Sequence, residues 1–135
     1  MTNQLATDVR NAMLDAWETQ IGPSPILKIR TGAPPANASA ADTGTALSSA
    51  TLPADFMAAS SGGSKAKLGT WQDLAADAAG TAGHYRLYAS DGVTCKMQGT
   101  VSLAGGGGDM ILSALVLDVG VKFTVTTWTL TQGGA

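Results

Sequence analysis

The sequence predicts a mainly β protein: an antiparallel β-sandwich or jelly-roll-like barrel with one N-terminal α-helix. One segment near the N-terminus has a helical period, and strand-like runs separated by turn residues follow it through the rest of the chain. The last run, Lys122 to Thr131, alternates bulky apolar residues with threonines, as a half-buried antiparallel strand does. We therefore divide the chain into an N-terminal helix at residues 1–22 and a β-sandwich domain at residues 23–135, with a long loop at about residues 31–64.

The helical segment has an apolar stripe of side chains spaced four residues apart: Leu5, Val9, Met13 and Trp17. Thr2 or Asn3 can cap its start, and Gly22 followed by Pro23 ends it. Leu14 interrupts the polar face opposite the stripe. Two interpretations stay open. The helix packs over an end or face of the β-domain, or it docks as an arm on a neighbouring subunit, for which Leu14 argues.

A short strand from Pro25 to Arg30 follows, and Pro34 and Pro35 stop further strand pairing. From there to about Ser64 the chain is a low-complexity tract, which predicts an extended surface loop with short paired pieces at residues 46–47 and 51–52. Loops this long in a compact domain are usually functional, or order on binding. We expect this tract and the helix to contact partner proteins. The candidate interface residues are Trp17, Pro34, Pro35, Leu47, Leu52 and Phe56.

The second half of the chain is more regular. A strand from His84 to Ala89 turns at Asp91-Gly92 into a strand from Val93 to Val101, because Asp-Gly between two such runs is a strong hairpin signal. The run Gly105 to Gly108 predicts a flexible turn. In the closing strand the apolar phase slips by one residue at Thr126-Thr127, which predicts a bulge. We expect a core made of the few large residues: Trp17, Ile26, Leu27, Ile29, Phe56, Leu68, Trp71, Tyr85, Leu87, Phe123 and Trp128.

Composition and charge argue against several classes of partner. The net charge is −2 and the basic residues are scattered, so we expect no nucleic-acid binding. The N-terminus lacks the basic and apolar regions of a signal peptide, and the apolar runs are too short to cross a bilayer, so we expect no membrane association. Cys95, the single cysteine, forms no intrachain disulfide; it is either a small buried or edge-strand residue, or a thiol near a symmetry axis that bridges copies.

The sequence holds no evident constellation of reactive residues, so we expect a protein that is not an enzyme and that uses no cofactor or metal. His84 is the only histidine and no Gly-x-Ser-x-Gly elbow accompanies it, which indicates a surface or interface side chain. The run at Gly105 lacks the Lys-Ser/Thr ending of a phosphate-binding loop. One alternative is a carbohydrate-binding module that uses Trp71, Tyr85 or Trp128, although a core position explains these rings better.

Four segments carry a resemblance to a known class of proteins: Leu27 to Pro34, Ala58 to Gly63, Gly83 to Gly92, and the Thr-rich strand from Val121 to Leu130. With the strand end Ile-Arg-Thr-Gly and the hairpin Tyr-Arg-Leu-Tyr-Ala-Ser-Asp-Gly, the chain resembles small structural proteins of tailed bacteriophages. The resemblance covers much of the chain after Gly22, in turn and strand residues. None of the family's functional residues carries over onto this sequence.

The resemblance implies a virion protein that is made in the host cytoplasm. Its most plausible role is that of a head decoration (cement) protein, which binds the capsid in symmetric copies and stabilises it by subunit contacts. The implied partners are the major capsid protein or other virion subunits, and further copies of the chain, with a trimer favoured. A tail, collar or fibre-associated virion protein is the alternative within the same class.

Overall fold

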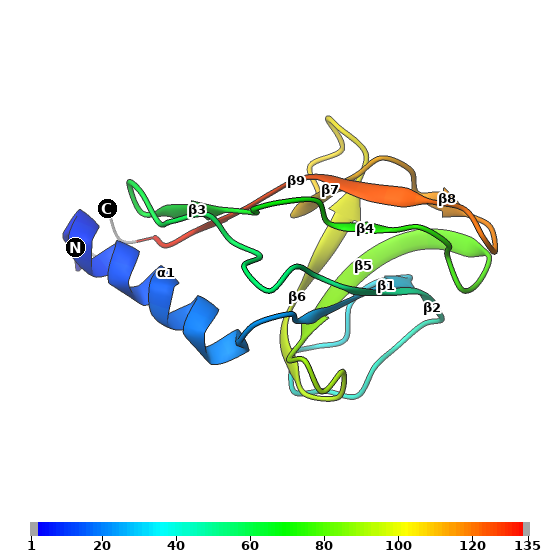
Figure 1. Ribbon diagram of the computed structural model, residues 1–135, viewed down its shortest axis with the longest axis horizontal. Helices are drawn as coiled ribbons and strands as arrows, with labels where there is room; N and C mark the ends of the chain where they lie inside the picture. Colours follow the sequence, from blue (N-terminus) through cyan, green and yellow to red (C-terminus); the bar gives the residue numbers. More distant parts are fainter. Residues whose placement is uncertain (1–2, 134–135) are drawn as a thin grey trace.

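The computed structural model describes residues 3–133, and it confirms a mainly β fold with one helix. The elements are α1 (Thr7–Ile21), β1 (Ile26–Thr31), β2 (Ala46–Thr51), β3 (Ser64–Ala66), β4 (Gln72–Asp73), β5 (Gly80–Tyr88), β6 (Cys95–Ser102), β7 (Met110–Leu112), β8 (Val116–Leu117) and β9 (Phe123–Thr131). Figure 1 shows β3, β4 and β9 along one side of the body and β1, β2 and β5 along the other, in a sandwich-like arrangement. The helix α1 lies at one end of the longest axis, and β8 lies towards the other end.

The strands form one largely antiparallel sheet in the order β2-β1-β5-β6-β7-β9-β3, to which β4 adds against β9 and β8 against β5. The predicted hairpin between β5 and β6 is confirmed, with His84 opposite Thr100. Its turn is fixed by Asp91, whose Oδ1 accepts the backbone N–H groups of Val93 (2.9 Å) and Thr94 (3.0 Å). These hydrogen bonds lower the pKa of Asp91, because they stabilise its charged form.

One strand pair is parallel: Val101 of β6 lies opposite Met110 of β7. Parallel neighbours usually need a long crossover, but here residues 103–109 return the chain within one short loop. Its glycines make this possible, since a Cβ on Gly108 would lie 2.7 Å from the backbone nitrogen of Ser102. The predicted flexible turn at Gly105 to Gly108 is therefore a tight return loop.

The predicted bulge in β9 is confirmed. Ile111 lies opposite Thr127, whereas its neighbour Leu112 lies opposite Val125, so Thr126 is the extra residue. The bulge shifts the set of inward-facing residues by one position. Val125 and Trp128 are therefore both buried in the core although they are three residues apart. This lets one strand supply buried side chains on both sides of the slip.

The core is built around tryptophan rings. The ring centroid of Trp128 lies 5.4 Å from that of Trp71 and 5.7 Å from that of Trp17, and its Nε1 donates a hydrogen bond to the hydroxyl of Tyr85 (3.1 Å). Burial raises the pKa of Tyr85 to about 12. The predicted core members that are fully buried are Leu27, Ile29, Phe56, Trp71, Tyr85, Leu87, Phe123 and Trp128. Trp17 and Ile26 are partly buried, and the prediction for Leu68 is wrong, because its side chain is exposed.

The predicted orientation of the helix is wrong. Leu14 and Ile21 are buried, while Val9 and Met13 are 45% and 43% exposed. Of the predicted stripe only Trp17 packs against the core, while Lys65 of β3 lies beneath the polar face and pairs with Asp15 and Glu18. That face turns inward and takes Leu14 with it.

The N-terminal end of the helix differs from the prediction, whereas the C-terminal end agrees with it. The helix begins at Thr7, with Ala6 at the N-cap and no side-chain cap, so Asn3 does not fill that role; Thr2 lies outside the described residues. Gly22 ends the helix as predicted, with φ +83° and its N–H bonded to the carbonyl of Glu18 (3.0 Å).

The tract at 31–64 is more structured than a surface loop. It contains β2, which pairs with β1 along its length, from Ile26 opposite Thr51 to Arg30 opposite Ala46. The predicted paired pieces at residues 46–47 and 51–52 lie within or next to this strand. Two irregular segments are left, residues 32–45 and 52–63, and the first of them folds back over the sheet.

Candidate functional site

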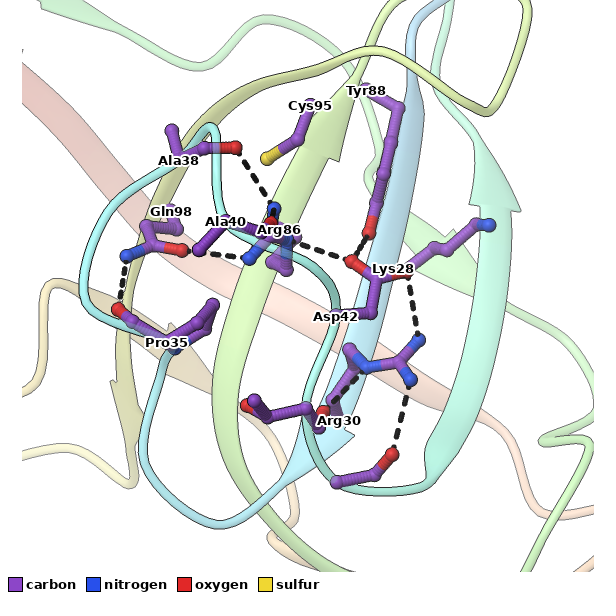
Figure 2. A network of polar contacts seen from close by, with 12 residues as sticks. Lys28, Arg30, Pro35, Ala38, Ala40, Asp42, Arg86, Tyr88, Cys95 and Gln98 are labelled. Atoms are coloured by element: carbon purple, nitrogen blue, oxygen red, sulfur yellow. Dashed lines mark hydrogen bonds and ion pairs between the residues drawn. The ribbon is translucent and has the colours of Figure 1, made fainter.

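Residues 32–45, which we call the strap, lie across the outer face of β1, β5 and β6 (Figure 2). Their main anchor is Arg86 of β5, whose side chain is 1% exposed. One guanidinium nitrogen donates hydrogen bonds to the carbonyls of Ala38 and Ala40, both at 2.9 Å, and the other donates to Gln98 Oε1 (3.0 Å). A buried guanidinium thus holds the strap by its backbone, which explains why small side chains suffice in this segment.

Asp42 of the strap faces the cations beneath it. Its Oδ1 lies 2.9 Å from Arg86 Nε, in an ion pair whose N–H is not aligned for a hydrogen bond, and its Oδ2 lies 3.6 Å from Arg30. Tyr88 donates its hydroxyl proton to the same carboxylate. Partial burial alone would raise the pKa of Asp42, but the Tyr88 hydrogen bond and the nearby cations outweigh it and lower that pKa. Burial, together with the carboxylate of Asp42, raises the pKa of Tyr88 to about 12.

Both ends of the strap are also tied to the sheet. Arg30 donates from Nε to the carbonyl of Thr43 (2.8 Å) and from a terminal nitrogen to that of Gly44 (3.0 Å). Gln98 donates from Nε2 to the carbonyl of Pro35 (2.7 Å). Gly44 has φ +69°, and a Cβ there would lie 2.1 Å from the carbonyl oxygen of Thr31. Glycine therefore fits this position without strain, and a residue with a side chain does not.

His84 lies under the start of the strap, and its predicted surface position is wrong. The side chain is fully buried, with Nδ1 at 2.8 Å from the carbonyl oxygen of Gly32. Because a carbonyl oxygen can only accept, Nδ1 carries the proton. His84, Arg86 and Tyr88 therefore form a row on β5 that binds successive parts of the strap. This row was not visible as a unit in the sequence, since its partner segment lies about 50 residues away in the chain.

A hollow of about 460 Å³ adjoins the strap, with Arg86, Tyr88, Thr94 and Cys95 among its lining residues. Arg86 already directs its donors to the strap and to Gln98. The arrangement therefore organises the strap, and the hollow is not a strong candidate for ligand binding. Within residues 3–133, no group of three or more His, Cys, Asp and Glu side chains is placed to hold a metal ion.

A second polar contact joins α1 to β3. Lys65 is 3% exposed, and its Nζ lies 2.9 Å from Asp15 Oδ1 and 2.8 Å from Glu18 Oε2. Burial alone would lower the pKa of Lys65, but the hydrogen bonds to Glu18 and Asp15 outweigh this and raise it. Next to this pair, Asn11 Oδ1 accepts the N–H of Gly63 (2.9 Å). The helix is thus attached to its own chain, which agrees with the first of the two interpretations of this segment.

The structure separates the six candidate interface residues. Leu47, Leu52 and Phe56 are fully buried in the core, so their side chains are not exposed to a partner. Trp17 is partly buried and packs 6.1 Å from Phe56, measured between ring centroids. Pro34 and Pro35 are partly exposed on the strap, and they are the candidates that remain closest to the surface.

Two exposed apolar surfaces were not among those candidates. On α1, Val9 and Met13 point away from the body, with the small residues Ala12 and Ala16 exposed beside them; we call these four residues the outer stripe. At the opposite end of the molecule, the loops around β4, β8 and the start of β9 expose four large side chains, which we call the tip: Leu74, Val116, Val119 and Val121. The outer stripe follows from the helical period once the orientation of α1 is known. The exposed residues of the tip depend on where the loops lie, which the sequence pattern does not show.

Comparison with protein-family models, with curated proteins and with solved structures found no match to this chain. In residues 3–133 the structure contains no helix of the length and apolar character that a membrane span requires.

Proposed function

We propose that this chain is a structural protein of a tailed-phage particle, where it decorates the capsid and stabilises it through contacts between subunits. The proposal begins from the resemblance of its strand ends and hairpin to small phage structural proteins. The observation that carries it further is the outer stripe of α1. A helix on the surface of an isolated domain normally directs charged residues to water, but this one directs Val9 and Met13 there.

The outer stripe suits a flat protein partner. Val9, Ala12, Met13 and Ala16 follow one another at three- and four-residue spacing, so they form one continuous strip along the helix. Alanine allows close approach, and valine and methionine supply the apolar area. Lys65 pairs with the acidic residues Asp15 and Glu18 on the side of the helix that faces the body, although the Asp15 side chain stays 58% exposed. The lattice of a capsid would repeat such a contact many times, and repeated weak contacts add up to strong attachment.

The test compares particles of the phage that encodes the chain, made with and without its gene. Particles that lack the protein should release their DNA at a lower temperature, and purified protein added back should restore the release temperature. The double substitution Val9→Asp and Met13→Asp should abolish binding to the particles. The matched control is Val93→Asp, which changes an exposed valine on the β5–β6 turn. Equal release temperatures with and without the protein would contradict the proposal.

Location on the particle distinguishes head from tail. Antibody labelling of intact particles should mark the shell; labelling of the tail, collar or fibres would replace the decoration role with the alternative role in the same virion. The carbohydrate-binding alternative has little support from the geometry, since Trp71, Tyr85 and Trp128 are buried and present no ring face to a sugar.

A further inference from the structure

The strap covers a row of buried side chains without burying any residue of its own. Every residue from 32 to 45 is exposed or only partly buried, and none belongs to the hydrophobic core. Beneath them His84, Arg86 and Tyr88, which we call the β5 row, are 0%, 1% and 2% exposed. The strap is therefore attached to the sheet by hydrogen bonds and ion pairs, and contacts of this kind can be made equally well by another chain.

The middle of the strap, residues 36–42, depends on two members of the β5 row. The two ends of the strap are held separately, by Gln98 and by Arg30. Between them, Arg86 binds two backbone carbonyls and pairs with Asp42, and Tyr88 donates a hydrogen bond to the same carboxylate. The β5 row thus recognises a short pattern in the strap: two backbone carbonyls followed by a carboxylate.

The positive charge under the strap exceeds the negative charge that the strap supplies (Figure 2). Lys28 of β1 lies directly opposite Arg86 of β5, so the two side chains stand on the same face of the sheet. Arg30 and Arg86 both pair with Asp42, whereas Lys28 forms no ion pair within residues 3–133 and lies over the ring of Tyr88, 4.6 Å from its centroid. One carboxylate therefore faces three cations, and this face favours an acidic partner.

We infer that the strap is an internal ligand of the β5 row, and that the row binds an acidic loop of a partner protein when that loop displaces the strap. The sequence Ala-Ser-Ala-Ala-Asp at residues 38–42 defines the chemistry of such a loop. Its small side chains let the backbone lie close to the guanidinium, and its carboxylate meets the cations. The hollow of about 460 Å³ beside the strap, which Arg86 and Tyr88 also line, leaves room on this face for the incoming loop. The inference does not rest on the proposed virion role.

A partner loop has to compete with a segment that is already tethered to the site. A short tether gives the strap an effective concentration of about millimolar order, so a free peptide of the same sequence binds the unmodified protein weakly. The apparent affinity rises in proportion to the population in which the strap is open. Asp42→Asn removes the carboxylate of the strap and leaves the β5 row intact, so it should raise the apparent affinity by about tenfold or more.

The test titrates a peptide of residues 36–43, with blocked ends, into the isotope-labelled full chain and follows the backbone amides by NMR. In the Asp42→Asn variant the amides of β5 should shift at peptide concentrations about tenfold lower than in the unmodified protein. Asp55→Asn, a change at an exposed aspartate outside the strap, should bind the peptide as the unmodified protein does. A peptide with asparagine in place of its aspartate should bind at least about fivefold more weakly.

Two substitutions in the Asp42→Asn background assign the binding to the β5 row. Arg86→Gln should abolish it, because the donors to both carbonyls are lost. Circular dichroism shows whether this variant is folded. Tyr88→Phe keeps the ring and removes only the hydroxyl, so it should weaken binding about fivefold and carries the test if Arg86→Gln does not fold. The inference is overturned if the peptide leaves the β5 amides of Asp42→Asn unshifted, or if it binds equally well without its aspartate or without the Tyr88 hydroxyl.

Discussion

Replacing Asp42 by Asn should release the strap without unfolding the β body. The substitution keeps the shape of the side chain and removes the charge that faces Arg86 and Arg30. Arg86 is buried, so it loses the carboxylate that compensates its charge. The remaining anchors of the strap are hydrogen bonds from the guanidinium groups to backbone carbonyls, such as those from Arg86 to Ala38 and Ala40.

The magnitude follows from the exposure of the pair. A hydrogen bond or close contact to a charged group contributes about 1.5–3 kcal/mol. Because Asp42 is 34% exposed, water screens part of this and the lower end of the range applies. The free energy of opening the strap should therefore fall by about 1.5–2 kcal/mol, which raises the open population roughly 10- to 30-fold.

Hydrogen exchange measured residue by residue tests this value. The backbone N–H of Ala40 is bonded to the carbonyl of Asn37, and that of Thr45 to the hydroxyl of Thr31, so both report on opening. Both should exchange roughly 10- to 30-fold faster in the variant, while amides of β5 keep their rates. Asp55→Asn, a change at an exposed aspartate outside the strap, is the matched control. Equal acceleration throughout the protein, or none in the strap, would refute the reasoning.

Acid should have the same effect on the unmodified protein. The folded pKa of Asp42 is lowered, so its contribution is complete above the ordinary aspartate value of about 3.9 and is lost as the pH falls through the folded value. Strap exchange, corrected for the intrinsic pH dependence, should therefore accelerate below about pH 4. The Asp42→Asn variant should lack this acceleration.

Three further substitutions test the packing. Trp128→Ala should lower the free energy of unfolding by about 3–5 kcal/mol in chemical denaturation, because a central ring is lost; a loss below about 1 kcal/mol would contradict its central position. Gly44→Ala should cost about 1–3 kcal/mol more than Gly62→Ala, since both have positive φ but only the first brings a Cβ against Thr31; equal costs would show that the strap yields there. Lys65→Ala should cost about 1–2 kcal/mol and speed proteolysis of α1, whereas unchanged proteolysis would mean that the helix is held by its apolar contacts alone.

The strands were predictable where the signal is local. Asp91-Gly92 sets a hairpin through its own backbone geometry, and the slip at Thr126 shows directly in the alternation of β9. The orientation of α1 was not predictable in this way. The polar face of α1 meets Lys65, which lies about 50 residues from Asp15 in the chain, and the helical period alone does not show which face meets that cation.

In the candidate site, too, features with a local sequence signal were predictable and features that depend on distant residues were not. Pro34 and Pro35 identify an irregular segment, but the residues that bind it are on β5, where His84, Arg86 and Tyr88 look like ordinary polar positions of a strand. Leu47 lies in a small-residue tract that indicates a surface loop, yet it is the extra residue of a bulge in β2, between the partners of Ile29 and Arg30 on β1, and it is buried in the core. Long-range pairing decides both outcomes, and composition reports only on the segment itself.

The contact between Arg10 and the carbonyl of Gln132 (3.4 Å) brings the start of α1 and the end of β9 together at one end of the body. A short linker could join these two segments, and the return loop at Gly105 to Gly108 offers a place to open new ends, which makes the fold a good subject for circular permutation. The first turns of α1 and the end of β9 therefore lie side by side, at the end of the body that holds the helix.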